Sequence, residues 1–65
     1  MYYIKITLKD SQIIDYTDEY RTLEEIKALY NKALKEDIFF IETRDVVTFV
    51  RSENISTVFI QNVKE

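Results

Sequence analysis

Three apolar segments follow one another in the second half of the chain, and they constrain the fold more than any other feature of the sequence. They cover residues 38–43, 46–51 and 55–62, and only two or three polar residues separate each from the next. Successive side chains of a strand point to opposite faces, and here both faces carry large apolar residues. We predict that one face is formed by Phe40, Val46, Val50, Ile55 and Phe59 and the other by Phe39, Ile41, Val47, Phe49, Val58 and Ile60.

A single helix can cover only one of these two faces. If the six large side chains of the second face stayed in water, the forgone burial would come to about 9 kcal/mol, at roughly 1.5 to 3 kcal/mol for each. That is comparable with the whole stability of a small domain. The second face is therefore closed inside a small barrel, covered by a second copy, or covered by a different protein. We favour self-association. The predicted self-association surface consists of the six side chains of the second face: Phe39, Ile41, Val47, Phe49, Val58 and Ile60.

Chain length makes such an association more important. We expect residues 1–65 to form one domain, and a domain of this size buries only roughly 60% of its unfolded surface. Small domains often depend on disulfides, metals or oligomerisation. The sequence has no cysteine and no histidine, which excludes disulfides and the commonest transition-metal ligand. Oligomerisation is the stabilising device that remains.

The same absences restrict catalysis. Without histidine or cysteine the chain cannot form a Ser-His-Asp or Cys-His nucleophile system, and without glycine it cannot form a phosphate-binding loop. The neighbouring acids Glu24 and Glu25, and Glu36 and Asp37, point apart on a helix or its end and are better explained as surface charge. We predict that the protein is not an enzyme and has no metal or cofactor.

The first half of the chain gives local signals for a hairpin and a helix. Residues 2–8 alternate strictly between apolar and polar, residues 9–11 are typical of a turn, and residues 12–16 form a second, shorter strand. Thr22 stands three residues before Glu25, which is the spacing of a capping box, and a helix follows to about residue 36. Its apolar face comprises Leu23, Ile26, Leu29, Tyr30, Ala33 and Leu34.

These elements give the order β-β-α-β-β-β. Short connections favour antiparallel neighbours, so we expect the last three strands to form a meander. The predicted fold class is α+β: a single small domain with an antiparallel sheet and one helix packed on one face.

The stretch before the helix is the predicted partner-binding site. It combines two tyrosines with three acids, namely Asp15, Tyr16, Asp18, Glu19 and Tyr20. Tyrosine among polar groups is a common interface anchor, and the acids favour a partner with a basic surface. The simpler alternative is that the tyrosines pack beside the strand and the helix cap while the acids lie in a solvated turn.

Charge and hydropathy limit the other classes of partner. The chain has nine Lys and Arg and twelve Asp and Glu, a net charge of −3, and this balance disfavours nucleic-acid binding. Its best candidates are Arg44 and Arg51 beside Phe49. No apolar run is long enough to cross a membrane, and the first residues do not resemble an export signal. We therefore expect a soluble, cytoplasmic protein without membrane contact.

One segment resembles a known family. Residues 46–58, Val-Val-Thr-Phe-Val-Arg-Ser-Glu-Asn-Ile-Ser-Thr-Val, are similar to the second conserved segment of the Sm-like RNA-binding proteins, in which a strand leads through a tight link into Ile-Ser-Thr-Val. The resemblance covers about a fifth of the chain, and it implies a ring-forming oligomer that binds RNA. The hairpin before the helix and the absence of glycine depart from that family's pattern.

The function that we favour is stoichiometric protein binding. The chain resembles, in general character, the small inhibitor and accessory proteins of phages and mobile elements, which act by occupying a partner's surface. We expect it to act as a homo-oligomer, most simply a homodimer. The alternatives are a small nucleic-acid-binding regulator and a small-ligand binder at a subunit seam lined by Phe39 and Phe49.

Overall fold

The computed structural model describes residues 1–64 and shows a small α+β domain. Its elements are β1 (Tyr2–Leu8), β2 (Ile13–Asp18), α1 (Leu23–Ala33), β3 (Ile38–Glu42), β4 (Val47–Arg51), the short 3-10 helix η1 (Ser52–Asn54) and β5 (Ile55–Asn62). The predicted class and the order β-β-α-β-β-β are confirmed. The first and last strands have the predicted bounds, β2 runs two residues further than predicted, and α1 ends about three residues earlier.

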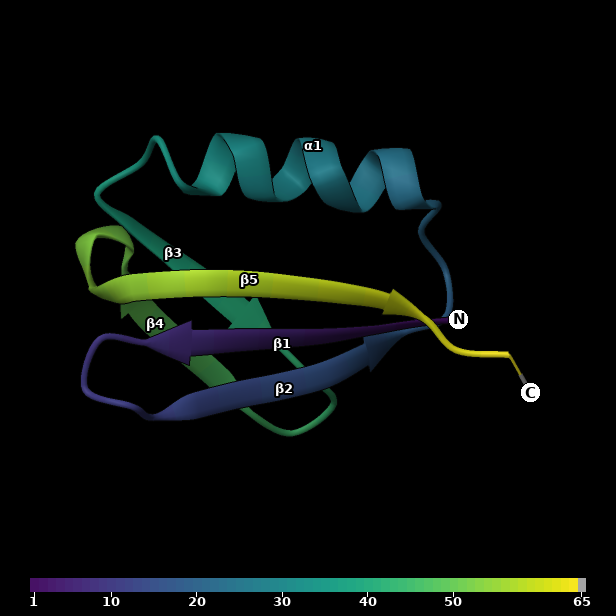
Figure 1. The fold of residues 1–65 in the computed structure, drawn as a ribbon, viewed down its shortest axis with the longest axis horizontal. Coiled ribbons are helices and arrows are strands. Elements are labelled where there is room, and N and C mark those ends of the chain that lie inside the picture. Colours follow the sequence, from purple (N-terminus) through teal and green to yellow (C-terminus); the bar gives the residue numbers. More distant parts are fainter. Residues whose placement is uncertain (65) are drawn as a thin grey trace.

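The strands form two antiparallel sheets instead of one. The first sheet has the order β2-β1-β5, and the second is the hairpin β3-β4. Figure 1 shows the hairpin behind the three-stranded sheet, with α1 lying along one side of both. The predicted meander is therefore wrong for its last step, because η1 redirects the chain and β5 pairs with β1. This pairing places Val58 and Ile60 opposite Ile6 and Ile4, which completes the apolar inner face of the first sheet.

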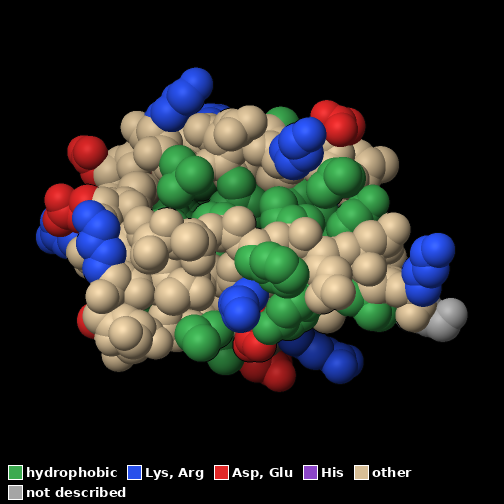
Figure 2. All heavy atoms as spheres, in the orientation of Figure 1, with side chains coloured by type: hydrophobic (Ala, Val, Ile, Leu, Met, Phe, Trp, Pro, Cys, Tyr) green, Lys and Arg blue, Asp and Glu red, His purple; other side chains and the backbone are tan. Residues whose placement is uncertain are grey.

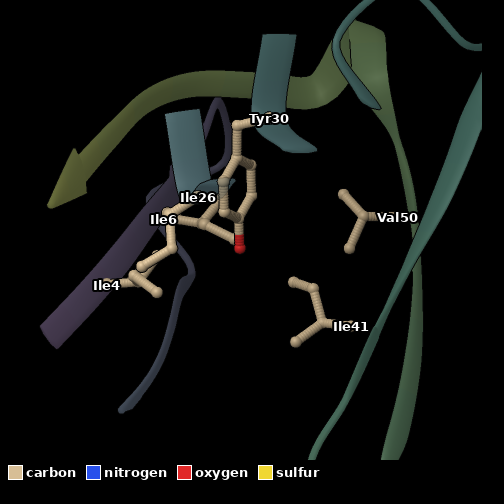
Figure 3. Close-up of a cluster of buried hydrophobic side chains, with 6 residues drawn as sticks. All are labelled: Ile4, Ile6, Ile26, Tyr30, Ile41 and Val50. Atoms are coloured by element: carbon tan, nitrogen blue, oxygen red, sulfur yellow. The ribbon is translucent and has the colours of Figure 1, made fainter. Parts of the chain in front are cut away.

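One core lies between the two sheets and the helix. Its buried side chains come from four elements and are Ile4, Ile6, Ile26, Tyr30, Ile41 and Val50. Figure 3 shows them converging from β1, α1 and the β3-β4 hairpin. The isoleucines of β1 and α1 are fully buried, so the middle strand of the first sheet is the centre of the fold.

Four residues of the predicted self-association surface belong to this interior. Ile41 is in the core, and Phe39, Val58 and Ile60 are partly buried against it. The prediction that these four face away from the covered side was therefore wrong. Only two of the six predicted residues, Val47 and Phe49, are exposed.

The error came from the register of β4 relative to β3, which decides which side chains of the two strands share a face. The register pairs Phe39 with Val50 and Phe40 with Phe49. Because directly paired residues share a face, Phe40 and Phe49 lie together on the outer side. A shift of one residue between two neighbouring strands exchanges inside and outside, and the sequence pattern alone did not fix that phase.

The helix begins as its sequence predicts. Thr22 Oγ1 accepts a hydrogen bond from the Glu25 amide at 3.2 Å, and the Thr22 amide donates to Glu25 Oε1 at 3.1 Å. At the other end, the Ser52 hydroxyl of η1 donates to the Ala33 carbonyl at 3.0 Å and satisfies one acceptor of the last turn. This contact comes from a segment that is distant in sequence. It lies at the residue where the helix ends, about three residues earlier than predicted. Within residues 1–64, no helix has the length and apolar character needed to cross a membrane.

Candidate functional site

The predicted partner-binding segment lies at the end of β2 and in the loop that follows it. The structure divides its five residues between the outside and the inside of the molecule. Asp15, Glu19 and Tyr20 are exposed, whereas Tyr16 is partly buried and Asp18 is buried. The alternation of β2 explains the division, because Tyr16 and Asp18 point inward from the same strand as the outward-pointing Asp15.

The buried carboxylate of Asp18 holds the loop between β2 and α1. One oxygen accepts hydrogen bonds from the amides of Tyr20 and Arg21 at 2.9 and 3.0 Å, and the other accepts from Arg21 Nη1 at 2.8 Å. Burial by itself would raise the pKa of Asp18, but the bonds from Arg21 and from the Tyr20 amide outweigh it and hold this pKa below its usual value. The carboxylate is committed to its own loop and is not free to meet a basic group of a partner.

Tyr20 occupies the opposite environment on the same loop. Its side chain is 92% exposed, although its backbone amide is fixed by Asp18, which is only 6% exposed. Glu19 is exposed beside it. The loop therefore presents an aromatic ring and a carboxylate to solvent from a backbone that is already ordered.

Tyr16 has a structural role instead of the predicted contact role. Its hydroxyl is hydrogen bonded to the hydroxyl of Tyr30, which links β2 to α1. Burial, followed by this hydrogen bond, raises the pKa of Tyr30, and burial is also the main cause that raises the pKa of Tyr16. Tyr30 in turn packs edge-on against Phe39 with ring centroids 6.2 Å apart. Tyr16 thus contributes to the core that supports the loop.

The outward side of the β3-β4 hairpin is the second candidate surface. We name it the hairpin face, and it comprises Ile38, Phe40, Glu42, Val47, Phe49 and Arg51. Its four apolar side chains are 52%, 60%, 51% and 72% exposed for Ile38, Phe40, Val47 and Phe49 respectively. The rings of Phe40 and Phe49 lie side by side at its centre, 6.0 Å apart.

The charges of the hairpin face stand at opposite corners. Cross-strand pairing places Ile38 beside Arg51 at one end and Glu42 beside Val47 at the other. Each end therefore has one apolar and one charged side chain, with the acid on β3 and the base on β4. Sequence reasoning missed Ile38, Phe40 and Glu42 because it assigned Phe40 to the face opposite Phe49 and assigned Ile38 and Glu42 to neither face.

An open cleft separates the second half of α1 from β3. Its volume is about 570 Å³, and its apolar lining includes Leu29, Tyr30, Phe39 and Ile41. The ligand site predicted at a subunit seam needs Phe39 and Phe49 on one surface, whereas Phe39 lines this cleft and Phe49 points out from the other face of the hairpin.

Comparisons with protein-family models, with curated proteins and with solved structures find no match for this chain. The segment that resembles the Sm-like proteins forms β4, η1 and the first part of β5, so it does consist of two strands with a tight link. Ring assembly and RNA binding stay predictions. No group of three or more acidic residues gathers as a metal site within residues 1–64.

Proposed function

We propose that this protein is a stoichiometric binding protein that acts by occupying the surface of another protein, with Tyr20 and Glu19 as its contact residues. The observation that carries the proposal is the loop after β2. A buried, ionised carboxylate fixes the backbone on which an almost fully exposed tyrosine stands.

A fixed loop favours binding for a physical reason. Ordering a flexible segment upon association opposes binding, and this loop is ordered before any partner arrives. Tyrosine is enriched among the residues that dominate interface energies, because it offers a large ring and a hydroxyl with few rotatable bonds. Glu19 adds a negative charge at the rim, which favours lysine or arginine on the partner.

The first experiment identifies the partner through Tyr20 itself. A photo-cross-linking phenylalanine analogue at position 20 is expected to link the protein to one partner in its own cells. The same analogue in place of Ile13, an exposed residue at the other end of β2, serves as the control and should not give this product. Equal products from both positions would contradict a specific contact at the loop.

The second experiment measures the contribution of the contact with the purified partner. Tyr20→Ala should weaken binding roughly 30-fold, which is the loss expected for a central interface tyrosine of about 2 kcal/mol. Ile13→Ala should bind as the wild type does. Calorimetry measures both affinities, and circular dichroism verifies that both variants fold. Wild-type affinity in Tyr20→Ala would exclude the loop as the site.

A second candidate function is the binding of a small apolar ligand in the cleft between α1 and β3. The specific observation is the cleft volume of about 570 Å³, which lies in the range of ligand sites. A ligand of this kind would raise the melting temperature of the wild type, because it binds only the folded state. The same ligand should stabilise Leu29→Arg less, since that change places a charge at the rim of the cleft.

A further inference from the structure

The folded chain exposes more surface than its mass predicts. Its accessible surface is 5164 Å² for 7.8 kDa. Folded monomers of this mass expose about 4,400 Å² according to the usual scaling of surface with mass. The excess of about 800 Å² matches the area that one partner contributes to a standard protein interface.

The hairpin face contributes apolar side chains to this surface. Its four apolar side chains are each more than half exposed and lie next to one another in two paired strands. Contiguous apolar surface of this kind marks interaction sites in soluble proteins. The phenylalanine pair occupies its centre, and charged residues occur only at its ends, which is the usual anatomy of an interface.

We propose that the hairpin face binds a second copy of this chain in a two-fold symmetric dimer. The charges at its corners make the face complementary to itself. A two-fold axis that lies in the face, passes between Phe40 and Phe49 and runs at about 45° to the strands, leaning toward the Ile38 and Val47 corners, turns the Arg51 corner of one copy toward the Glu42 corner of the other. Arg51 then meets Glu42 of the partner subunit, and the symmetry repeats this ion pair once more.

The same axis packs the aromatic rings together. It places Phe40 and Phe49 of both copies at the centre of the interface, and it makes the two hairpins cross at nearly a right angle, a known mode of packing between sheets. The other two-fold axes within the face would put Arg51 against Ile38, against Val47 or against another Arg51. Each of those arrangements covers a charge without an opposite partner, which costs free energy.

The dimer goes beyond the proposed function because it uses a different surface. The contact residues of the loop, Glu19 and Tyr20, are not part of the hairpin face. Dimerisation therefore leaves the loop free and gives the assembly two copies of it. An assembly with two loops binds a partner with two sites more tightly than one chain does.

The mass of the wild type in solution is the first test. Light scattering over a concentration series should give twice 7.8 kDa for the intact protein. A mass of 7.8 kDa at every concentration would overturn the proposal and leave the Tyr20 loop untouched. Phe40→Ser with Phe49→Ser should give a monomer. Phe59→Ser, a matched change of an exposed phenylalanine on the other sheet, should leave the dimer intact.

Charge reversal tests the arrangement and does not depend on the apolar variants. Glu42→Arg alone and Arg51→Glu alone should each weaken dimerisation at least tenfold, because each faces two like charges in its own dimer. The two single variants mixed together should form a heterodimer, since both of its ion pairs are then restored. The chain that carries both changes should dimerise as the wild type does. Single reversals that dimerise at wild-type strength, or a mixture that stays monomeric, would overturn the two-fold arrangement.

Discussion

The two sheets turn very different outer faces to solvent. On the three-stranded sheet, the Tyr3 hydroxyl donates to Asp15 Oδ2 at 2.8 Å, and the Lys5 ammonium lies 5.5 Å from the centre of the Phe59 ring. Figure 2 views the molecule from this side and shows hydrophobic side chains gathered mainly between α1 and β5. On the hairpin face, the ring of Phe40 lies beside another exposed aromatic ring, Phe49.

The difference shows that two sheets of one small chain can present outer faces of different polarity with the same backbone geometry. Both faces belong to antiparallel pairs, and the register shift of the β1-β5 pair lies at Thr7 and Leu8, away from Phe59, so the backbone around the phenylalanines does not distinguish the two faces. The side chains do, because the first sheet partly covers its phenylalanine with its own lysine. The hairpin leaves both of its outer phenylalanines more than half exposed.

The largest expected effect lies on the inner side of the three-stranded sheet. Ile6→Ala removes a fully buried side chain from β1 and should lower the free energy of unfolding by about 2 to 5 kcal/mol. Urea denaturation measures the loss. A cost below about 1 kcal/mol would mean that this sheet is not the stable part of the molecule, and the comparison between the two sheets would lose its basis.

A second prediction compares two acids of β2 that point to opposite sides. Asp18→Asn should destabilise the fold by about 1 to 3 kcal/mol, because a buried, charged acceptor of three hydrogen bonds is lost. Asp15→Asn should change the stability much less, since Asp15 is exposed. Urea denaturation at neutral pH measures both changes, and equal losses would contradict the different roles that we assign to these residues.

The pKa of Asp18 gives this comparison a pH dependence. Because the folded state holds this pKa below its unfolded value, the carboxylate stabilises the fold above about pH 4, and this contribution is lost as the pH falls through the folded pKa. The acid-induced loss of stability should be smaller in Asp18→Asn than in the wild type. Identical acid profiles would exclude Asp18 as a source of the loss.

A third prediction compares two phenylalanines on the two outer faces. In a Glu42→Arg background at concentrations where it is monomeric, Phe59→Ser should cost about 0.5 to 1 kcal/mol more than Phe49→Ser, because Phe59 is the more buried ring and its contact with Lys5 is lost, whereas Phe49 loses its contact with the exposed Phe40. Phe49 is 72% exposed and Phe59 46% exposed, which favours the same order. Denaturation of the two variants measures the difference, and the reverse order would show that the hairpin face stabilises the monomer.

The smallest effect concerns the titration of Tyr3. The hydrogen bond to Asp15, together with slight desolvation and the negative charge of this acid, raises the pKa of Tyr3 above its usual value. Asp15→Asn should bring this pKa down toward 10, and ultraviolet absorbance or NMR follows the change. In terms of stability, the raised pKa favours the folded state below about pH 10, and the benefit is lost as the pH rises through the folded value. An unchanged Tyr3 titration in this variant would mean that the bond is not maintained in solution.

Local sequence signals predicted much of the fold. The capping box of Thr22 and Glu25 set the start of the helix, and the strict alternation of residues 2–8 set β1, because both signals act between near neighbours. The candidate site was predicted only in part. The segment with Tyr20 was identified, but Tyr16 and Asp18 were assigned to the surface because the second strand was expected to end at residue 16. A strand extended to residue 18 would have placed both inside by its alternation, and the spacing of Asp18 and Arg21 just before the helix cap was a further signal.

The sequence by itself determined which segments are strands and helix and that the last strands carry apolar residues on both faces. Only the tertiary structure decided that β5 leaves β4 to pair with β1, and which face of the hairpin points inward. The physical reason is that side-chain alternation has a period of two, which defines two faces but not their direction. The direction is set by the partner that buries one of them, here Ile4 and Ile6 of a strand more than thirty residues away in sequence.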